Sequence, residues 1–219
     1  LIKTIARHER YSLYKMLQGY LNHLEKYPSS LLVPIYGLHD IDQLSVIVMG
    51  NVFNSTYQIE SAWDLKGSIV GRSSPNSFIK KDLDFDRGFL FGPENAELAR
   101  QIRLDALFLK SNNIVDYSML VGYHTLNSQE TQDFEQRNLA LSPAAHPYFD
   151  RGLRSYDPSG KLKNEIWFMG IIDILIQFGV LKKAEKFVKS LVHDPQSISI
   201  IPPDQYADRF SNYLVSCIR

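Results

Sequence analysis

The sequence predicts an α+β fold, because segments with strand and helix periodicity alternate along its 219 residues. The first segment, LIKTIA (1–6), alternates apolar and polar side chains as a half-buried strand does. From Glu9 to Tyr27, leucines and tyrosines recur at helical spacing. The strand-like runs LLVPIYGL (31–38) and LSVIVMG (44–50) come next. These segments predict a small lobe, residues 1–53, whose sheet lacks its first members. Because the chain starts inside a strand and without Met, we expect it to be a fragment.

Residues 54–219 predict a second, larger lobe. Its elements are expected as a turn-rich stretch (54–91), a helix from about Pro93 to Lys110, a strand in NNIVDYSMLVGYH (112–124), a polar insertion loop without fixed structure (126–147), a buried strand in EIWFMGIIDILI (165–176), a basic amphipathic helix (181–194), a short strand SISII (197–201) and a terminal helix containing Tyr206 and Phe210.

Composition bounds the function without choosing one. Lys and Arg together number 24, as do Asp and Glu, so no overall field favours a nucleic-acid partner and any basic surface must be local. The single cysteine, Cys217, excludes an internal disulfide and suits a reducing compartment. No apolar run approaches the roughly 20 residues that a membrane span needs.

Two acids stand in strongly apolar surroundings: Asp116 in IVDYSML and Asp173 in GIIDILI. An ionised carboxylate in such a run must be paired, bound to a cation or exposed in a cleft. The simplest interpretation is that each caps a turn at a strand end. Together with Lys3 on the first strand, however, they match the needs of phosphoryl transfer from ATP, which are a cation on the phosphates, an acid that holds magnesium and an acid near the attacking hydroxyl.

The pattern of an ordinary protein kinase does not fit. Val121 stands five residues after Asp116, where a protein-kinase catalytic loop has its metal-binding Asn. Ile-Val rather than His-Arg precedes Asp116, and Asp173 is followed by Ile-Leu rather than Phe-Gly. A phosphoryl-transfer enzyme of another kind is therefore the better hypothesis.

Five motifs, in order along the whole chain, resemble the phosphatidylinositol phosphate kinases. They are DLKGS (64–68), KDLDF (81–85), IVDYSMLVGYH (114–124), GIIDIL (170–175) and YADRF (206–210). The combination is highly specific, and KKAEKFVKSLVHD (182–194) is most similar to the type I enzymes, the phosphatidylinositol 4-phosphate 5-kinases. The resemblance implies a two-lobed, atypical protein-kinase-like fold with an incomplete N-terminal lobe and a specificity segment over 174–200. The glycine-rich loop and a dimerisation region of the family would precede Leu1, which would allow a homodimer.

The resemblance implies a role for each candidate catalytic group. Lys3 would grip the ATP phosphates, Asp116 would orient the lipid hydroxyl and take its proton, and Asp173 would hold Mg²⁺. The residues that would enclose the adenine are Met49, Asn51 and Phe53 at the hinge, with Leu120 and Ile172 as an apolar floor.

Substrate recognition needs cations, because the inositol headgroup carries a dianionic phosphate. By resemblance, Lys66 and Arg72 would bind this headgroup, although a solvated strand-end lysine is the simpler interpretation of Lys66. Glu185 would pair with a substrate-site cation such as Arg72 and favour the 4-phosphate lipid. Lys182 and Lys183 lie on the basic face of an expected helix, which is either a solvated surface helix or a contact with anionic lipid worth about 1 kcal/mol per lysine.

The favoured hypothesis is an ATP- and Mg²⁺-dependent kinase that phosphorylates the 5-hydroxyl of phosphatidylinositol 4-phosphate on the cytosolic face of a membrane, with the plasma membrane favoured. A catalytically weak phosphoinositide-binding scaffold is the first alternative, and Lys3, Asp116 and Asp173 together argue against it. A 4-kinase that uses the 5-phosphate lipid is the second, and Glu185 argues against that one.

Overall fold

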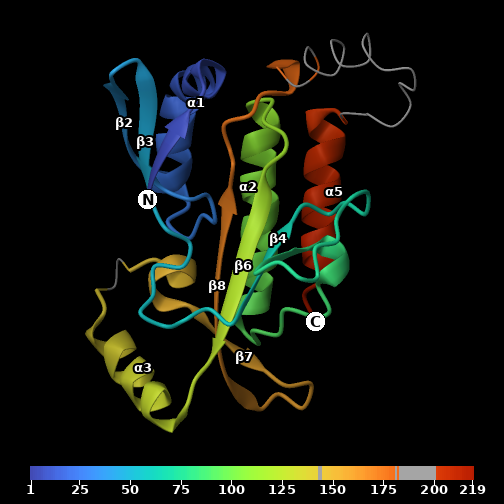
Figure 1. The fold of residues 1–219 in the computed structure, drawn as a ribbon. Helices are drawn as coiled ribbons and strands as arrows, with labels where there is room; N and C mark the ends of the chain where they lie inside the picture. The colour runs from blue at the N-terminus through green and yellow to red at the C-terminus, as the bar shows by residue number, and fades with distance from the viewer. Residues whose placement is uncertain (143–144, 181, 183–200) are drawn as a thin grey trace.

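The protein was analysed as a computed structural model that describes residues 1–142, 145–180, 182 and 201–219 (Figure 1). Its elements, in chain order, are β1 (Ile2–Ile5), α1 (Arg7–Lys26), β2 (Ile35–Ile41), β3 (Leu44–Met49), β4 (Ser61–Leu65), β5 (Ile79–Lys81), η1 (Asp82–Asp84), α2 (Glu94–Ser111), β6 (Ser118–Thr125), α3 (Ser128–Ala140), η2 (Pro147–Arg151), β7 (Leu153–Tyr156), β8 (Leu162–Ile172) and α5 (Pro203–Ser216). Helices and strands are both well represented, which confirms the mixed α and β composition expected from the sequence.

The N-terminal segments form a small antiparallel sheet in the order β1-β3-β2. Asp42 and Gln43, both with positive φ (45° and 73°), make the two-residue turn between β2 and β3, because this geometry suits the twist of a tight hairpin. The buried side of α1, which carries Leu13 and Met16, belongs to the same core as Ile47 of β3. In this sheet Lys3 of β1 pairs with Ile47 of β3.

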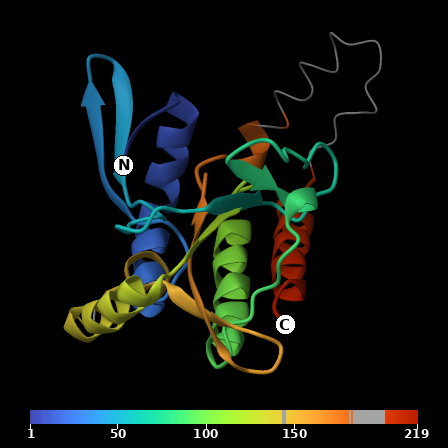
Figure 2. The ribbon, with the colours of Figure 1, turned by 60° about the horizontal axis from the view of Figure 1, so that its bottom comes forward.

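A larger sheet follows in the order β5-β4-β6-β8-β7. Side chains alternate between its two faces, as strand geometry requires. Met119 and Val121 of β6 point into the main core, where α2 and α5 lie side by side along the sheet (Figures 1 and 2). Leu120 and Gly122 point to the opposite face, which is the face nearer residues 52–53. The second face is the one that bears on the candidate site.

A buried carboxylate joins α1, α2 and the loop that follows α1. Asp105 of α2 is fully buried and accepts hydrogen bonds from His23 Nε2 (2.6 Å), Ser30 Oγ (2.8 Å), the backbone N–H of Leu31 (2.7 Å) and Gln101 Nε2 (2.8 Å). A carboxylate removed from water needs such a complete set of donors. The contact holds the segment after α1 against β8.

Three expectations about the elements were wrong. The segment from Leu31 to Pro34 does not belong to β2 but runs beside β8, where the backbone of Val33 donates to Ile171 (3.0 Å). Residues 126–147 are not an unstructured loop, because α3 occupies most of them; its N-cap Asn127 accepts from the N–H of Glu130 (2.9 Å). Neither acid lies inside a strand: β6 begins two residues after Asp116, and β8 ends one residue before Asp173.

Over the residues that the structure describes, no helix combines the length and the hydropathy needed to cross a bilayer. The expected strand at 197–201 and the basic helix at 181–194 lie almost wholly outside the described residues.

Candidate active site

The two acids lie at one end of the central strand pair. Asp116 precedes β6 and Asp173 follows β8, while Ser118 pairs with Ile172 in register. Beyond the acids these two segments of the chain pair once more, through an antiparallel bridge between Ile114 and Gln177. Both acids have positive φ, 64° and 60°. Such backbone geometry is uncommon for residues other than glycine and often marks a functional position. The local backbone therefore turns both carboxylates out of the sheet at the same end of these two strands.

Two lysines from other strands reach these carboxylates. Lys3 Nζ lies 2.8 Å from Asp173 Oδ1, and Lys66 Nζ lies 2.5 Å from Asp116 Oδ1. Lys66 directly follows β4, whose Leu65 pairs with Met119 of β6, so the sheet register brings Lys66 to Asp116. Lys3 comes from the smaller sheet and crosses to β8. Thus residues far apart in the chain form two neighbouring ion pairs at the same strand ends.

Both ion pairs are partly open to solvent. The side chains of Lys3 and Asp173 are 48% and 39% exposed, and Asp116 is 47% exposed. Exposed ion pairs stabilise a fold by only about 0–1 kcal/mol. Exchange of one partner for a phosphate or a cation would therefore cost little.

A narrow crevice of about 20 Å³ opens beside the first pair. Its lining includes Lys3, Asp173, Met49 and Glu9, together with apolar side chains from the core. Glu9 was not singled out from the sequence; its carboxylate accepts from the backbone N–H of Ala6 (2.7 Å). An acid on the helix that follows the lysine strand is the signal that could have found it, since protein kinases use one to orient their lysine. Met49 is the only one of the expected adenine contacts, all of which are described, that lines this crevice.

The other expected adenine contacts lie along the second face of the larger sheet. Asn51 bonds the backbone of Phe53 in both directions (3.1 Å each) rather than facing the crevice. The ring of Phe53 lies over Gly122, where a Cβ atom would come within 2.7 Å of it. Leu120 and Ile172 point to this same face, half-buried. Their adenine role stays a prediction.

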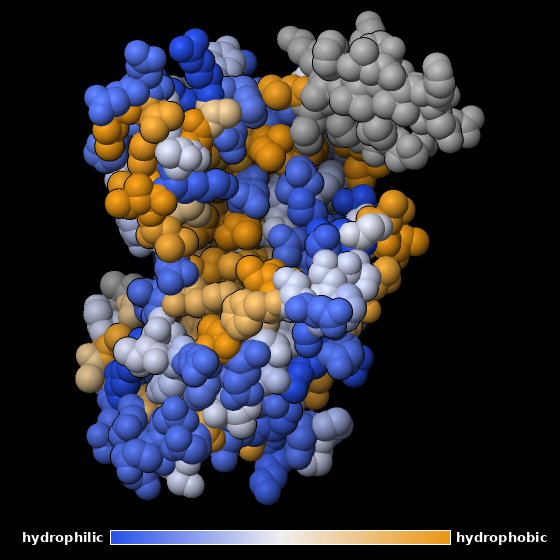
Figure 3. Space-filling model, viewed as in Figure 1, coloured by the Kyte–Doolittle hydropathy of each residue, from blue (hydrophilic) through white to orange (hydrophobic). Residues whose placement is uncertain are grey.

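This face carries apolar surface across its middle, between the small sheet and α3 (Figure 3). Glycines let side chains pack closely over the strands here: Gly122 lies under Phe53 and Ile59, and Gly170 lies under Val52 and Phe149. An apolar surface next to two lysine–carboxylate pairs suits a base joined to a phosphate chain.

Arg72 has partners other than the expected ones. Its Nε donates to Asp82 (2.5 Å) and its Nη2 donates to the carboxylate (2.5 Å) and the backbone carbonyl of Asp64. Burial by itself lowers the pKa of this guanidinium, but the bonds to the two carboxylates outweigh it and raise the pKa. Asp82 also accepts from the N–H groups of Lys66 (2.8 Å) and Gly67 (2.6 Å). Arg72 therefore fastens the DLKGS turn; a headgroup role, which stays a prediction, would depend on its Nη1.

The sequence interpretation assigned no role to Asp82, although KDLDF is one of the five motifs. The several N–H donors of an arginine such as Arg72 can bond more than one carboxylate, and this is the signal that could have linked the two segments.

The YADRF segment supplies a cation near Asp116. The hydroxyl of Tyr206 donates to the carbonyl of Tyr117 (2.5 Å), and burial followed by the nearby charge of Asp116 raises the pKa of Tyr206. The guanidinium of Arg209 lies 4.8 Å from the Tyr206 ring centroid, and its buried Nε has no hydrogen-bond partner among the described residues. Arg209 was missed in the sequence, where the motif was noted but its arginine was not considered.

The remaining substrate candidates fall at the margin of the described chain. Lys182 is exposed, with Nζ 5.2 Å from the centroid of the Phe178 ring. Lys183, Glu185 and nearly all of the 182–194 segment lie outside the described residues. Their expected membrane and specificity roles stay predictions.

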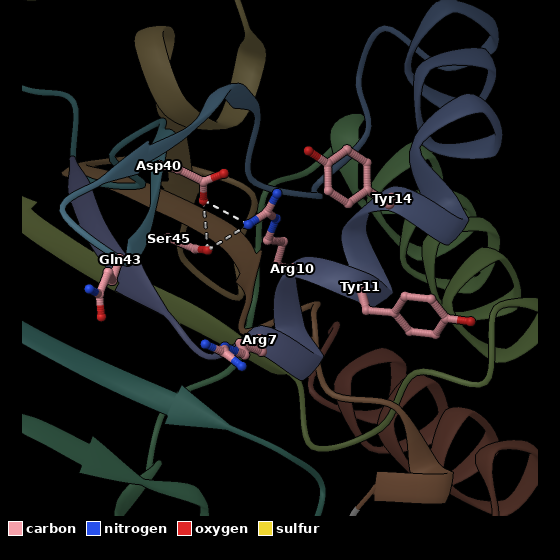
Figure 4. A pocket seen from close by; sticks show the side chains of 7 residues that line it. All are labelled: Arg7, Arg10, Tyr11, Tyr14, Asp40, Gln43 and Ser45. Atoms are coloured by element: carbon pink, nitrogen blue, oxygen red, sulfur yellow. Dashed lines mark hydrogen bonds and ion pairs between the residues drawn. The ribbon is translucent and has the colours of Figure 1, made fainter.

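A larger hollow, of about 570 Å³, lies elsewhere, between α1 and the β2–β3 hairpin (Figure 4). In Figure 4 the guanidinium of Arg10 points to Asp40 (2.8 Å) and Ser45 (3.5 Å), with Tyr11 and Tyr14 beyond it. Neither strand-end acid lines this hollow. The chemistry expected of the chain belongs to the smaller crevice.

The site fits Mg²⁺ in one specific way. Among the described residues no three His, Cys, Asp or Glu side chains gather closely enough to hold a metal ion by themselves. Mg²⁺, however, usually binds through one or two carboxylates together with phosphate oxygens and water. Asp173, half-exposed in the crevice beside Lys3, offers such a carboxylate.

Two lysine–carboxylate pairs at the ends of neighbouring strands, beside an apolar surface, are the parts that an ATP-dependent phosphotransferase needs. The comparison with protein families gives the particular group. The family model described as Phosphatidylinositol-4-phosphate 5-Kinase matches residues 1–217, and the chain belongs to this family.

Curated relatives match nearly the whole length of this chain. A probable phosphatidylinositol phosphate kinase of Dictyostelium discoideum is 31% identical over 100% of this chain and 39% of its own length. A phosphatidylinositol 4-phosphate 5-kinase of Plasmodium falciparum is 34% identical over 98% of this chain and 14% of its own. A phosphatidylinositol 4-phosphate 5-kinase type-1 beta of Gallus gallus is 29% identical over 98% of this chain and 47% of its own. The chain thus spans less than half the length of each of these relatives.

Proposed function

We propose that the protein transfers the γ-phosphate of ATP to the 5-hydroxyl of phosphatidylinositol 4-phosphate and so forms phosphatidylinositol 4,5-bisphosphate. The observation that carries this proposal is the pairing of Lys3 with Asp173 and of Lys66 with Asp116 at the ends of β6 and β8 in the larger sheet. Membership of the kinase family supports it, and so do the printed names of the relatives.

The first pair would serve the nucleotide. Lys3 is the cation nearest the crevice and would exchange Asp173 for the phosphate oxygens of ATP. Asp173 would then be free to hold Mg²⁺, which neutralises charge on the transferred group when it is bound. The half-exposure of both side chains favours this exchange.

The second pair would serve the lipid. Asp116 would accept the proton of the attacking hydroxyl, because its carboxylate faces the open edge of the site. Lys66 and Arg209 would meet the phosphate already on the inositol ring, since ionic hydrogen bonds to phosphate are short and strong. Arg209 is the better placed for a new partner, because its Nε has none within the part of the chain that the structure describes.

The architecture would be the two-lobed one of the family, in which the β1-β3-β2 sheet with α1 forms the remaining N-terminal lobe. The crevice lined by Lys3, Met49 and Asp173 would be the nucleotide cleft between the lobes. A lipid substrate would also require the protein to work on the cytosolic face of a membrane, held from outside the bilayer.

A direct assay tests this function. The full-length protein is given radiolabelled ATP, Mg²⁺ and vesicles that contain phosphatidylinositol, its 4-phosphate or its 5-phosphate, and the labelled hydroxyl is identified after deacylation. We expect label on the 4-phosphate lipid, at the 5-position. Label at the 4-position of the 5-phosphate lipid would make the protein a 4-kinase. Absence of label from every lipid, by protein that binds these vesicles, would make it a scaffold.

A further inference from the structure

Apolar side chains project into solvent from the turn that follows Lys66. Ile69 is 74% exposed and Val70 is 81% exposed, which makes them two of the most exposed large apolar residues in the described chain. Leu83, 59% exposed, lies at the end of the same turn, where its backbone N–H donates to the carbonyl of Arg72 (2.9 Å). We call Ile69, Val70, Leu83 and the neighbouring Lys81 the tip surface. Neighbouring exposed apolar residues of this kind usually mark an interaction site.

The tip surface is held firmly. Gly67, with φ of 69°, sits against α5, where an added Cβ would lie 3.0 Å from the carbonyl of Arg209 and 3.0 Å from Tyr213. At the other end of the turn, Arg72 is bonded to Asp82 and Asp64. The buried ion pairs of Arg72 thus brace a short loop whose apolar residues point away from the protein. A flexible loop would lose more conformational freedom when it bound a partner.

Lysines lie at the base of these apolar residues. Lys81 Nζ approaches the carbonyl of Gly71 (3.4 Å), whereas the side chain of Lys80 on β5 turns to the ring of Trp63 (5.7 Å). Lys66, at the start of the turn, bonds the candidate catalytic Asp116. An apolar tip with lysines at its base complements an interface that is apolar within and anionic at its surface, which describes a bilayer with acidic lipids.

We propose that the tip surface inserts into the headgroup layer of an anionic membrane and so brings the edge that carries Asp116 to its lipid. This inference rests on the proposed function, since a membrane substrate must approach Asp116 from the bilayer. It is independent of Lys182 and Lys183. The alternative occupants of the tip surface, a second copy of the chain or a protein partner, are outcomes of the test below.

The test uses the full-length protein with Ile69→Ser and Val70→Ser combined. Two readouts are compared: sedimentation with phosphatidylcholine vesicles with and without phosphatidylserine, and phosphate transfer to phosphatidylinositol 4-phosphate in vesicles or in a short-chain, monomeric form. The matched control is Ile41→Ser with Leu44→Ser, which are 56% and 57% exposed on the β2–β3 hairpin.

We expect the tip variant to bind anionic vesicles about tenfold more weakly and to lose vesicle-borne activity in proportion, because two apolar side chains no longer leave water. Its activity on the monomeric lipid should equal that of the wild type, and the control should change neither readout. Unchanged vesicle binding by the tip variant would overturn the proposal. So would a tip variant whose only change is its oligomeric state in the absence of lipid, which would assign the surface to a second copy.

The two claims fail in distinguishable ways. If the wild-type protein phosphorylates neither form of the lipid but loses vesicle binding in the tip variant, the proposed catalytic function is wrong and the membrane contact stands. If both forms are phosphorylated and the tip variant behaves as wild type, the contact is wrong and the function stands.

Discussion

Single residues decide which groups are free to react. Arg72 and Lys66 are both cations of the DLKGS region, yet their surroundings differ. The Arg72 side chain is only 12% exposed and is bonded to two carboxylates, whereas Lys66 bonds a carboxylate that is 47% exposed. A largely buried cation bonded to two carboxylates contributes to the fold, and a cation on an open carboxylate can change partner. We therefore expect the two lysine pairs to react and Arg72 to hold the turn.

Arg72→Met should lower the free energy of unfolding by about 2–4 kcal/mol, because Asp82 and Asp64 would lose the cation that compensates their burial. Urea denaturation measures this loss, with Arg103→Met as the control, since Arg103 is exposed and its hydrogen bond to the helix carbonyl of Ala99 is long (3.5 Å). If Arg72→Met leaves stability unchanged and instead raises the KM for lipid, Arg72 binds the headgroup and the bracing role is wrong.

The sequence marks the reactive acids, and the family resemblance assigns Lys3 and Lys66 to the same site, but neither gives the contacts between them. Asp116 and Asp173 can be found because each interrupts an apolar run. Their positive φ values, which break the strand geometry at these points, could not be read from residues that favour strands on both sides. The bond from Lys66 to Asp116 spans 50 positions and depends on the register between β4 and β6, which no local pattern encodes.

At the scale of elements, buried polar bonds fix positions that periodicity leaves open. The apolar run at residues 31–38 predicts a strand, but only its second half pairs in β2. The first half is held beside β8 by Asp105, which accepts from Ser30 and Leu31. In α3 the opposite happened: the segment is polar enough to suggest a loop, yet the capping pair Asn127 and Glu130 starts a helix. That capping pattern is present in the sequence and could have predicted the start of the helix.

Asp105→Ala should destabilise the fold by at least about 3 kcal/mol, because four donors would be left buried without their acceptor. Thermal or urea unfolding measures it. Asp133→Ala on α3 is the matched control, since Asp133 is exposed and accepts from Gln129 within the same helix. Equal stabilities for the two variants would show that Asp105 does not join α1 to α2 as described.

At the scale of the whole molecule, His146 ties the chain after α3 to the loop after α1. Its Nε2 donates to the carbonyl of Ser30 (2.8 Å), its Nδ1 accepts from the N–H of Tyr148 (3.2 Å), and its ring stacks on Phe149 with centroids 4.1 Å apart. These bonds require the neutral ring. Burial lowers the pKa of His146 more than its bond to Ser30 and the charges of Asp150 and Asp105 raise it.

A lowered folded pKa makes stability depend on pH with a definite sign. In the unfolded chain the pKa of the ring is about 6.5. The contribution of His146 to the free energy of unfolding is therefore fully present above that pH, and it is lost as the pH falls through the lower pKa of the folded state. The free energy of unfolding should therefore decrease between about pH 7.5 and about pH 5.5, and His146→Gln should make this decrease smaller. His8→Gln, at an exposed position, is the control. A pH dependence that is the same in His146→Gln and the wild type would contradict the assignment.

The arrangement of the two sheets was the part least accessible from sequence alone. Each sheet can be inferred from its own strands and turns, but the crossing of Lys3 from the small sheet to Asp173 of the large one depends on how the two sheets pack. That packing is set by shared core residues such as Tyr20, whose hydroxyl donates to the carbonyl of Val33 (2.9 Å). The family motifs imply the convergence, and the packing of the two sheets determines its geometry.

The most direct measurement is the rate at which Asp116→Asn transfers the γ-phosphate of ATP to phosphatidylinositol 4-phosphate. Asparagine keeps the size of the side chain but cannot accept the hydroxyl proton. We expect the rate to fall by about a thousandfold, with ATP binding and the unfolding midpoint close to those of the wild type. A well-folded Asp116→Asn protein whose rate stays within about tenfold of the wild type would show that this strand-end carboxylate is not the catalytic acceptor.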